Sequence, residues 1–235
     1  PSGIDYPKTV TYFENRLVFG GTLYRPTTLL MSESDNYTGW QVPAVIVPNQ
    51  ALEVEIAVRK REKMRGLLAL QRLLIFTDAT VRAMGGSTPL TPTTANSVRV
   101  ISEVGCSVVP PMLAGNRALF VRAKGRGIHF VQPSESDGDS FGSRDISSHA
   151  AHFFREDAGV GGVNNWRHSG QTLTTEVVDW CWQEDPWNLI WMVRADGKLI
   201  SLQLSDHAGY SLHTTGPDAG DRFESVCSVP EAGED

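Results

Sequence analysis

Two histidines on a predicted helix have a spacing that could bind a metal ion. His149 and His152 lie three positions apart within residues 146–154, and Glu156 follows one turn later. Imidazole and carboxylate groups on one helix face are common zinc ligands. A short surface helix often carries such residues without a metal, and no further ligand is marked elsewhere in the sequence. We therefore expect no metal and no other cofactor.

A basic run suggests a second kind of chemistry, which is contact with phosphate. Its cations are Arg59, Lys60, Arg61, Lys63 and Arg65. The run is short, Glu62 interrupts it, and it lacks the interleaved aromatic residues of a nucleic-acid platform. We expect a solvated loop between strands, with a phosphate-binding basic patch as the alternative.

Catalysis has little support in this sequence. Carboxylates fall near predicted strand ends at Asp35, Asp78, Asp179 and Glu184, but nothing marks the opposed pair that a glycosidase needs. The sequence contains no nucleophile elbow, phosphate-binding loop or dinucleotide fingerprint. Tryptophans at 180, 182, 187 and 191 could form a sugar or base platform, but alternation along strands favours core packing. We predict that the protein is not an enzyme.

The composition is typical of a globular domain. The chain has 235 residues, of which 40% are hydrophobic and 20% charged, with a formal net charge of −6. An all-β chain of this length can fold as one unit. No run approaches the roughly 18 apolar residues of a membrane span, so we expect none. Cys106, Cys181 and Cys227 are odd in number and far apart, which suits a reducing cytoplasm better than a disulfide framework.

Apolar runs of strand length recur along the chain. They begin at Arg16, Arg72, Arg117 and Asn188, so their spacings are 56, 45 and 71 residues. These values are close to the roughly 40 to 50 residues of a propeller blade if one blade carries an insertion. Each run is continuously apolar, as expected for a strand covered on both faces. A strand should precede each run, and these lie at 10–13, 67–70, 107–113 and 177–182. Another should follow, at 28–31, 80–84, 128–131 and 199–204.

Turn residues support this meander. Asp196-Gly197 can take the positive φ angles of a tight hairpin turn, and the stretch around Gly115 acts similarly. Alternation of apolar and acidic residues predicts an outer strand at 52–58. The predicted fold class is therefore all-β and β-propeller-like, with blades of three to four antiparallel strands in one domain that spans 1–235.

One insertion, 132–176, departs from the repeat. It holds the expected short helix at 146–154 and an acidic loop with Asp137 and Asp139, which lacks the terminal glutamate of a calcium-binding loop. Near the end of the chain, 223–229 is predicted as the first strand of another blade. Because no partner strand follows it, we expect the natural chain to continue beyond Asp235, with closure of the ring by residues 4–11 as the alternative.

Several motifs in order resemble a known family. They are 13–22 (FENRLVFGGT), 28–32 (TLLMS), 73–77 (LLIFT), 115–121 (GNRALFV), 145–147 (DIS), 152–154 (HFF), 187–197 (WNLIWMVRADG) and 223–226 (FESV). Together they cover nearly the whole chain. In this order and spacing the sequence resembles the tail nozzle proteins of short-tailed bacteriophages, also called tail tubular protein B, and the related packaged-DNA stabilisation proteins.

The resemblance implies a propeller-bearing subunit of a homo-oligomeric ring, a hexamer in this family, that joins the tail adaptor protein to tail fibre or tip proteins. It implies assembly in the host cytoplasm, residence in the virion tail and transient passage of double-stranded DNA. A net charge of −6 suits a wall along which DNA slides. The insertion is the expected gate or subunit contact, with candidate residues Asp137, Asp139, Arg144, His149 and His152. The alternative is a free-standing β-propeller that binds a glycan or protein ligand.

Overall fold

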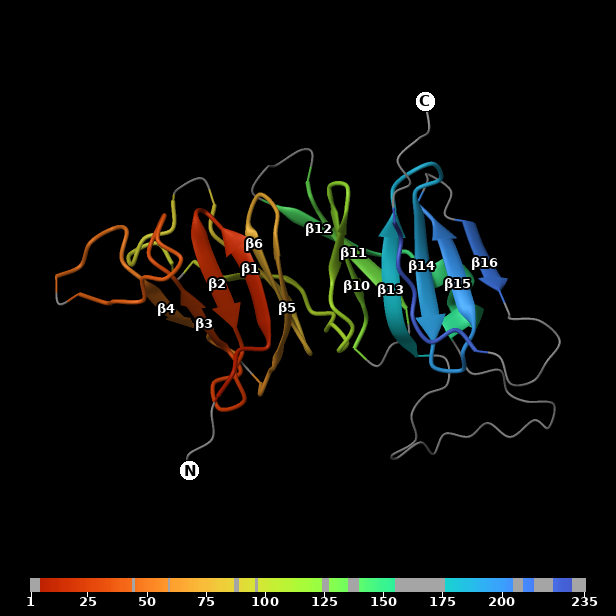
Figure 1. Ribbon diagram of the computed structural model, residues 1–235, viewed down its shortest axis with the longest axis horizontal. Coiled ribbons are helices and arrows are strands. Elements are labelled where there is room, and N and C mark those ends of the chain that lie inside the picture. Colours follow the sequence, from red (N-terminus) through yellow and green to blue (C-terminus); the bar gives the residue numbers. More distant parts are fainter. Residues whose placement is uncertain are drawn as a thin grey trace. The chain divides into compact units, whose positions relative to one another are not determined.

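The computed structural model describes residues 5–43, 45–58, 60–86, 89–95, 97–123, 127–134, 140–154, 176–204, 209–213 and 222–229. These residues form sixteen β-strands and one short helical segment (Figure 1).

The strands make four antiparallel sheets of four strands each, and strands adjacent in sequence pair side by side. The first sheet consists of β1 (Thr9–Phe13), β2 (Arg16–Gly20), β3 (Thr28–Met31) and β4 (Leu52–Glu55). The second consists of β5 (Met64–Ala69), β6 (Leu73–Thr77), β7 (Val81–Met84) and β8 (Arg99–Ser102). The third consists of β9 (Met112–Ala114), β10 (Arg117–Val121), β11 (Ile128–Pro133) and β12 (Phe141–Asp145). The fourth consists of β13 (Val177–Gln183), β14 (Leu189–Arg194), β15 (Leu199–Gln203) and β16 (Gly209–His213). The predicted all-β, propeller-like class is confirmed.

The four apolar runs of the sequence are the second strands of the four sheets, β2, β6, β10 and β14. All five residues of β6 are buried, as are the last four of β10. Continuous apolar character therefore marks one strand in each blade. The predicted neighbouring strands are found as well, except that only Met112–Ala114 of the stretch beginning at 107 is a strand, and the outer strand at 52–58 ends at Glu55.

Hairpin turns join successive strands of several sheets. Gly115 and Gly197 have φ angles of 58° and 81°, as predicted for these two turns. Glu14 and Asn15 also have positive φ angles, 46° and 57°. Two consecutive residues in this region turn the chain tightly between β1 and β2.

The chain divides into two compact units. The first comprises Pro1–Ala118 and Val131–Ser143, and the second comprises Leu119–Phe130 and Arg144–Asp235. In the first unit, side chains of the first and second sheets form one hydrophobic core, which includes Val18, Leu29, Met31, Leu73 and Ile75. The proposal of a single propeller-like domain over 1–235 stays a prediction.

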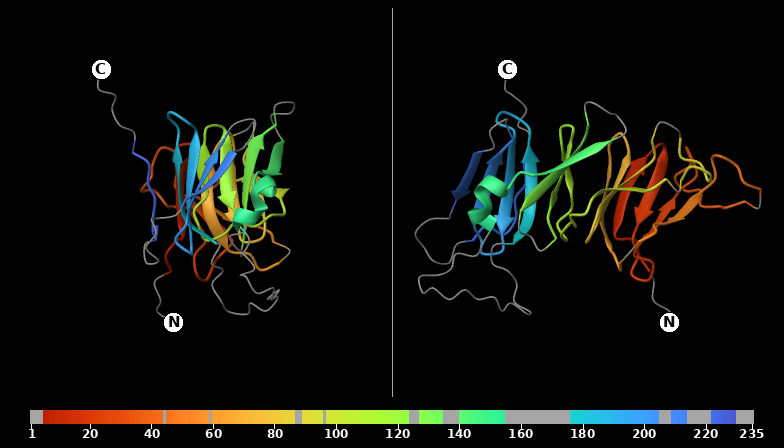
Figure 2. Two further views of the ribbon diagram at one scale, coloured as in Figure 1. Left: turned by 90° about the vertical axis from the view of Figure 1, so that its right-hand side faces the viewer. Right: turned by 180° about the vertical axis from the view of Figure 1, so that it is seen from behind.

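In the second unit, one face of the fourth sheet is buried. Trp180, Met192 and Ile200 lie in one row across β13, β14 and β15, and all three are buried. The helical segment Ser148–Phe154 lies beside this sheet (Figure 2). Its Phe154 meets the ring of Tyr210 on β16 edge to face, with ring centres 6.4 Å apart.

Of two predictions about local structure, one is confirmed in modified form and the other, a strand at 223–229, is wrong. The short helix expected at 146–154 is present as a 3₁₀ segment over Ser148–Phe154 with non-helical angles at Ala150. Seven residues are too few for a stable α-helix, and Asp145 accepts hydrogen bonds from the amide and hydroxyl of Ser147 ahead of it. The residues at 223–229 form no strand. The Val226 amide bonds to the side chain of Asp179 instead of a strand backbone.

Candidate functional site

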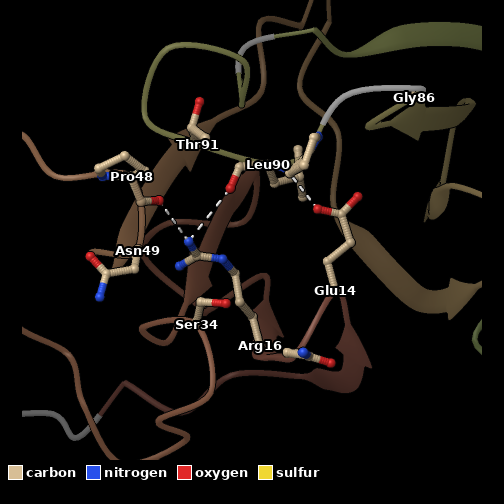
Figure 3. Close-up of a pocket in the computed structure, with 10 residues that line it drawn as sticks. Glu14, Arg16, Ser34, Pro48, Asn49, Gly86, Leu90 and Thr91 are labelled. Carbon is tan, nitrogen blue, oxygen red and sulfur yellow. Dashed lines mark hydrogen bonds between the residues drawn. The ribbon is translucent and has the colours of Figure 1, made fainter.

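A hollow of about 540 Å³ lies beside the turn between β1 and β2, entirely within the first unit (Figure 3). Its lining residues come from this turn and from two loops, β3–β4 and β7–β8: Glu14, Asn15, Arg16, Ser34, Pro48, Asn49, Gly86, Pro89, Leu90 and Thr91. Most of these residues are small or polar. The hollow therefore offers hydrogen-bonding groups rather than an apolar cavity.

Arg16 holds the loops around this hollow together. Its guanidinium donates hydrogen bonds to the carbonyl oxygens of Ser32 and Gln50, both at 2.7 Å, and of Pro48 at 3.1 Å. A longer bond of 3.5 Å reaches the carbonyl oxygen of Leu90 (Figure 3). Arg16 is only 2% exposed, so its charge is satisfied by backbone dipoles and not by water.

Glu14 closes the opposite side of the hollow. Its carboxylate accepts a 2.7 Å hydrogen bond from the amide of Leu90, so the same loop is bound by a cation and an anion (Figure 3). Burial lowers the pKa of Arg16, while the charges of Glu14 and Asp35 oppose that shift. An arginine remains a cation even so, because its ordinary pKa lies above about 12.

The polar groups of this hollow are mostly neutral. None of its lining residues is a cysteine, histidine, lysine or tyrosine, and Glu14 is its one carboxylate. The amides of Asn15 and Asn49 and the hydroxyls of Ser34 and Thr91 can bond a neutral polar ligand.

A second polar cluster lies within the second sheet and is a structural ion pair. The Glu62 carboxylate lies 3.2 Å from the Arg82 guanidinium, and both side chains are under 10% exposed. Glu62 also accepts hydrogen bonds from the hydroxyls of Thr77 and Thr80, at 2.8 and 2.9 Å. Arg82 donates a further bond to the carbonyl oxygen of Ala57. This cluster has no open side for a ligand.

A third cluster surrounds His129 on β11 in the second unit. Its Nε2 lies 3.3 Å from the carboxylate of Asp145, which also faces Arg122 at 3.6 Å. The imidazole is buried, and within the described residues neither of its nitrogens has a well-aligned hydrogen-bond partner. Burial lowers the pKa of His129, although Asp145 opposes the shift. The ring is therefore neutral at pH 7.

The predicted gate or contact residues are only partly described. Asp137 and Asp139 lie outside the described residues, as does most of the insertion. Arg144 is exposed on β12. His149 and His152 both belong to the 3₁₀ segment, and the exposed ring of His152 packs on Phe153 with centres 4.2 Å apart. Among the described residues, no group of three or more histidines, cysteines and acids is placed to bind a metal.

The predicted basic run divides between a loop and the start of β5. Lys60, Arg61 and Lys63 are exposed, and Arg59 lies outside the described residues. The guanidinium of Arg65 lies 3.8 Å from the carboxylate of Asp78, so one cation of the run is paired with an acid. The run is therefore not a uniform basic surface.

The other residues that the sequence singled out do not come together in a site. Trp180 is buried, while Trp187 is 62% exposed and the Trp191 indole donates a hydrogen bond to Gln183. Asp78 accepts a hydrogen bond from the Lys63 amide, and Asp179 accepts one from Val226. These two carboxylates act as local backbone caps.

Comparison with known proteins gives no family: no protein-family model matches the chain, and no curated protein matches its sequence. The molecule belongs to the class of all-β proteins with propeller-like blades. In the described part of the chain, no helix is long and apolar enough to cross a membrane.

Sequence reasoning missed the hollow and its central residue. Arg16 was recognised as the first residue of an apolar strand, but its partners are backbone carbonyls of residues 32, 48, 50 and 90. Every residue has a carbonyl, so such partners leave no mark in a sequence. The one signal in the sequence was that Arg16, a cation, is the first residue of a strand that is otherwise apolar.

Proposed function

We propose that this protein is a structural subunit of a phage tail, which forms a nozzle ring with other copies, surrounds the DNA channel, retains the packaged genome and allows its ejection. The observation that carries the proposal is the repeat. The segments that resemble the nozzle family at 16–20, 73–77, 117–121 and 189–194 occupy the same place, the second strand, in four successive blades. In this proposal the subunit assembles in the host cytoplasm and then resides in the virion tail.

The polar clusters favour a structural role over catalysis. Arg16 and the Glu62–Arg82 pair are buried and bonded to their own chain. A catalytic group must be reachable by a substrate and held near a second reacting group. Residues that fasten loops to blades instead give a rigid wall, which is what a conduit for a stiff duplex requires.

The charge of the chain is compatible with DNA passage. A net charge of −6 repels phosphate at long range, so it opposes tight capture of a passing duplex. The exposed cations at 60, 61 and 63 form only a short basic stretch. The candidate gate residues Asp137, Asp139, Arg144, His149 and His152 remain the proposed contacts of the insertion with DNA or with a neighbouring tail protein.

The test is an assembly experiment. The mass distribution of the full-length protein is measured by light scattering, alone and mixed with its tail adaptor, and large species are imaged by electron microscopy. Closed rings on the adaptor are the expected result. A persistent monomer that ignores the adaptor would contradict the proposal. Particles with Asp137→Asn and Asp139→Asn should assemble but lose DNA retention if the insertion is the gate, whereas deletion of all of 132–176 would also remove β12 from the third sheet.

The hollow beside Arg16 favours one alternative, a free-standing propeller that binds a neutral polar ligand such as a glycan. Its amides and hydroxyls are the groups that bond sugar hydroxyls. Binding of the isolated chain to a glycan array would support this alternative if Asn49→Ala removed it. Asn36→Ala is the control, because Asn36 lies on the same loop but does not line the hollow.

A further inference from the structure

The first sheet is apolar on both of its faces. Along β2, Val18 points into the core shared with the second sheet, and its neighbours Leu17 and Phe19 therefore point to the opposite side. Phe19 pairs with Val10 on β1 and with Leu30 on β3, so these three side chains form one row. Tyr12 pairs with Leu17 and begins the next row. We call the surface of Val10, Tyr12, Leu17, Phe19 and Leu30 the apolar face.

Much of the apolar face is open to solvent. Val10 is 55% exposed and Tyr12 is 61% exposed, whereas Leu17, Phe19 and Leu30 are half-buried. A sheet whose residues are apolar on both faces is normally covered on both faces. The core covers one face of this sheet, and the other is covered only in part, by the loop between β3 and β4.

The loop between β3 and β4 extends the apolar face. Its Tyr37 meets Tyr12 edge to face, and its Trp40 stacks on Phe19, with ring centres 5.2 and 5.3 Å apart. The two contacts fix the base of the loop on the sheet. Beyond them the loop runs outward from the first sheet (Figures 1 and 2).

Large apolar side chains stand at the far end of this loop. Val42, Val45 and Ile46 are 65%, 75% and 68% exposed. We call these three residues the loop tip. Isolated exposed valines are ordinary, but a cluster that continues an open apolar sheet face marks an interaction surface.

The charge pattern narrows the choice of partner. No charged residue occurs between Asp35 and Glu53, and Glu53 itself is paired with Arg25 at the margin of the sheet. A surface without cations offers nothing to nucleic acid. Two copies of a protein with a net charge of −6 repel each other over most of their surface. Contact through an uncharged surface avoids this repulsion and also avoids the free-energy cost of desolvating ions.

We propose that the apolar face and the loop tip form the contact with a second copy of this chain. The inference rests on the proposed function, because it names the surface through which one subunit of the ring meets the next. Stacking of a sheet on an apolar sheet face is the packing that this chain already uses between its own first and second sheets. The insertion at 132–176 is then left to act as the gate.

The test compares two variants of the whole chain by sedimentation velocity over a range of concentrations. Val45→Asp with Ile46→Asp places two carboxylates at the loop tip, where both side chains are too exposed to affect folding. Val108→Asp is the matched control, since Val108 is another valine of the first unit, 72% exposed, and lies outside the apolar face. Urea unfolding of all three proteins verifies that they fold equally well.

Wild type and Val108→Asp should self-associate with the same association constant. The association constant of the tip variant should be lower by a factor of about ten or more. Equal association of all three, or a wild type that stays monomeric, would overturn the inference. Loss of binding to phosphatidylcholine vesicles in the tip variant of a monomeric protein would overturn it in favour of a lipid surface. Normal rings of the tip variant on the adaptor would overturn it and leave the proposed function standing. Self-association of the wild type without rings on the adaptor would contradict the proposed function and leave the inference standing.

Discussion

The first and fourth sheets share one strand order but use their second strands differently. Each second strand carries a buried arginine, Arg16 on β2 and Arg194 on β14. Arg16 bonds four backbone carbonyls, those of residues 32, 48, 50 and 90. Arg194 bonds the carboxylate of Asp196 twice and one carbonyl, that of Phe153, at 2.7 Å. The arginine fastens loops in one blade and is neutralised locally in the other.

The open faces of the two sheets differ as well. On the fourth sheet the corresponding face pairs its polar groups, since Ser201 bonds His213 at 2.9 Å and Trp191 bonds Gln183 at 2.8 Å. On the first sheet, that position is taken by the apolar face. The repeat therefore fixes the backbone of each blade. The side chains on the open face of a sheet determine whether water or another sheet covers that face.

The largest expected effect concerns the two arginines. Arg16→Met keeps an apolar stem but leaves buried carbonyls without donors, so the free energy of unfolding should fall by roughly 3–5 kcal/mol. Arg194→Met should cost roughly 1–3 kcal/mol, because Asp196 is 20% exposed and can turn to water. Urea unfolding with hydrogen exchange, which assigns the loss to one unit, measures both. An equal or greater loss for Arg194→Met would remove the contrast between the sheets.

Adjacent residues of β3 test the two faces of the first sheet directly. Leu29 is fully buried in the core, so Leu29→Ala should lower the free energy of unfolding by about 2–5 kcal/mol. Leu30 is half-buried on the apolar face, and Leu30→Ala should cost under about 1 kcal/mol. The urea midpoints of the two variants give the comparison. If Leu30→Ala were as costly as its neighbour, the apolar face would be part of the core of a single chain.

These contrasts separate what the sequence could predict from what it could not. Continuous apolar strands such as 73–77 are visible in sequence because burial on both faces requires apolar residues at every position. The segment at 223–229 is also predicted as a strand, but its Val226 amide bonds to a side chain of β13, an outcome that depends on tertiary contacts. Likewise, the alternation of residues along a strand shows which side chains share a face of the sheet, but it does not show what covers that face.

The candidate site was less predictable than the fold. The residues of the insertion were chosen because loops often carry function, and only part of that insertion is described. The hollow at Arg16 instead gathers loops that lie up to 74 positions from it in the sequence. Hydrogen bonds to backbone over such separations depend on the packing of whole blades, so local patterns could not have revealed them.

A smaller effect should separate the two units by pH. All six histidines of the chain lie at or beyond position 129, so every histidine falls in the second unit. Burial lowers the pKa of His129 below that of the unfolded chain, so the unfolded state binds more protons. Its stabilising contribution is present above about pH 6.5 and is lost as the pH falls through its folded pKa.

The urea midpoint of the second unit should therefore drop between pH 7.5 and 5.5, and His129→Gln should flatten that drop. The midpoint of the first unit should stay constant. A first unit that followed the same pH curve would show that another group governs the transition.

The cysteines give the smallest effect, a difference in reactivity without a change in stability. In the first unit, burial raises the pKa of Cys106 to about 12, and its thiol donates to the Val109 carbonyl. In the second unit, Cys227 is exposed and Cys181 is half-buried. Because the thiolate is the reactive form, a thiol reagent at pH 8 should modify Cys227 first, Cys181 more slowly and Cys106 only after unfolding. Mass spectrometry of the timed digest identifies the order. Native Cys106 modified as fast as Cys227 would mean that the core of the first unit opens, and the stability contrast drawn from Leu29 and Leu30 would then fail with it.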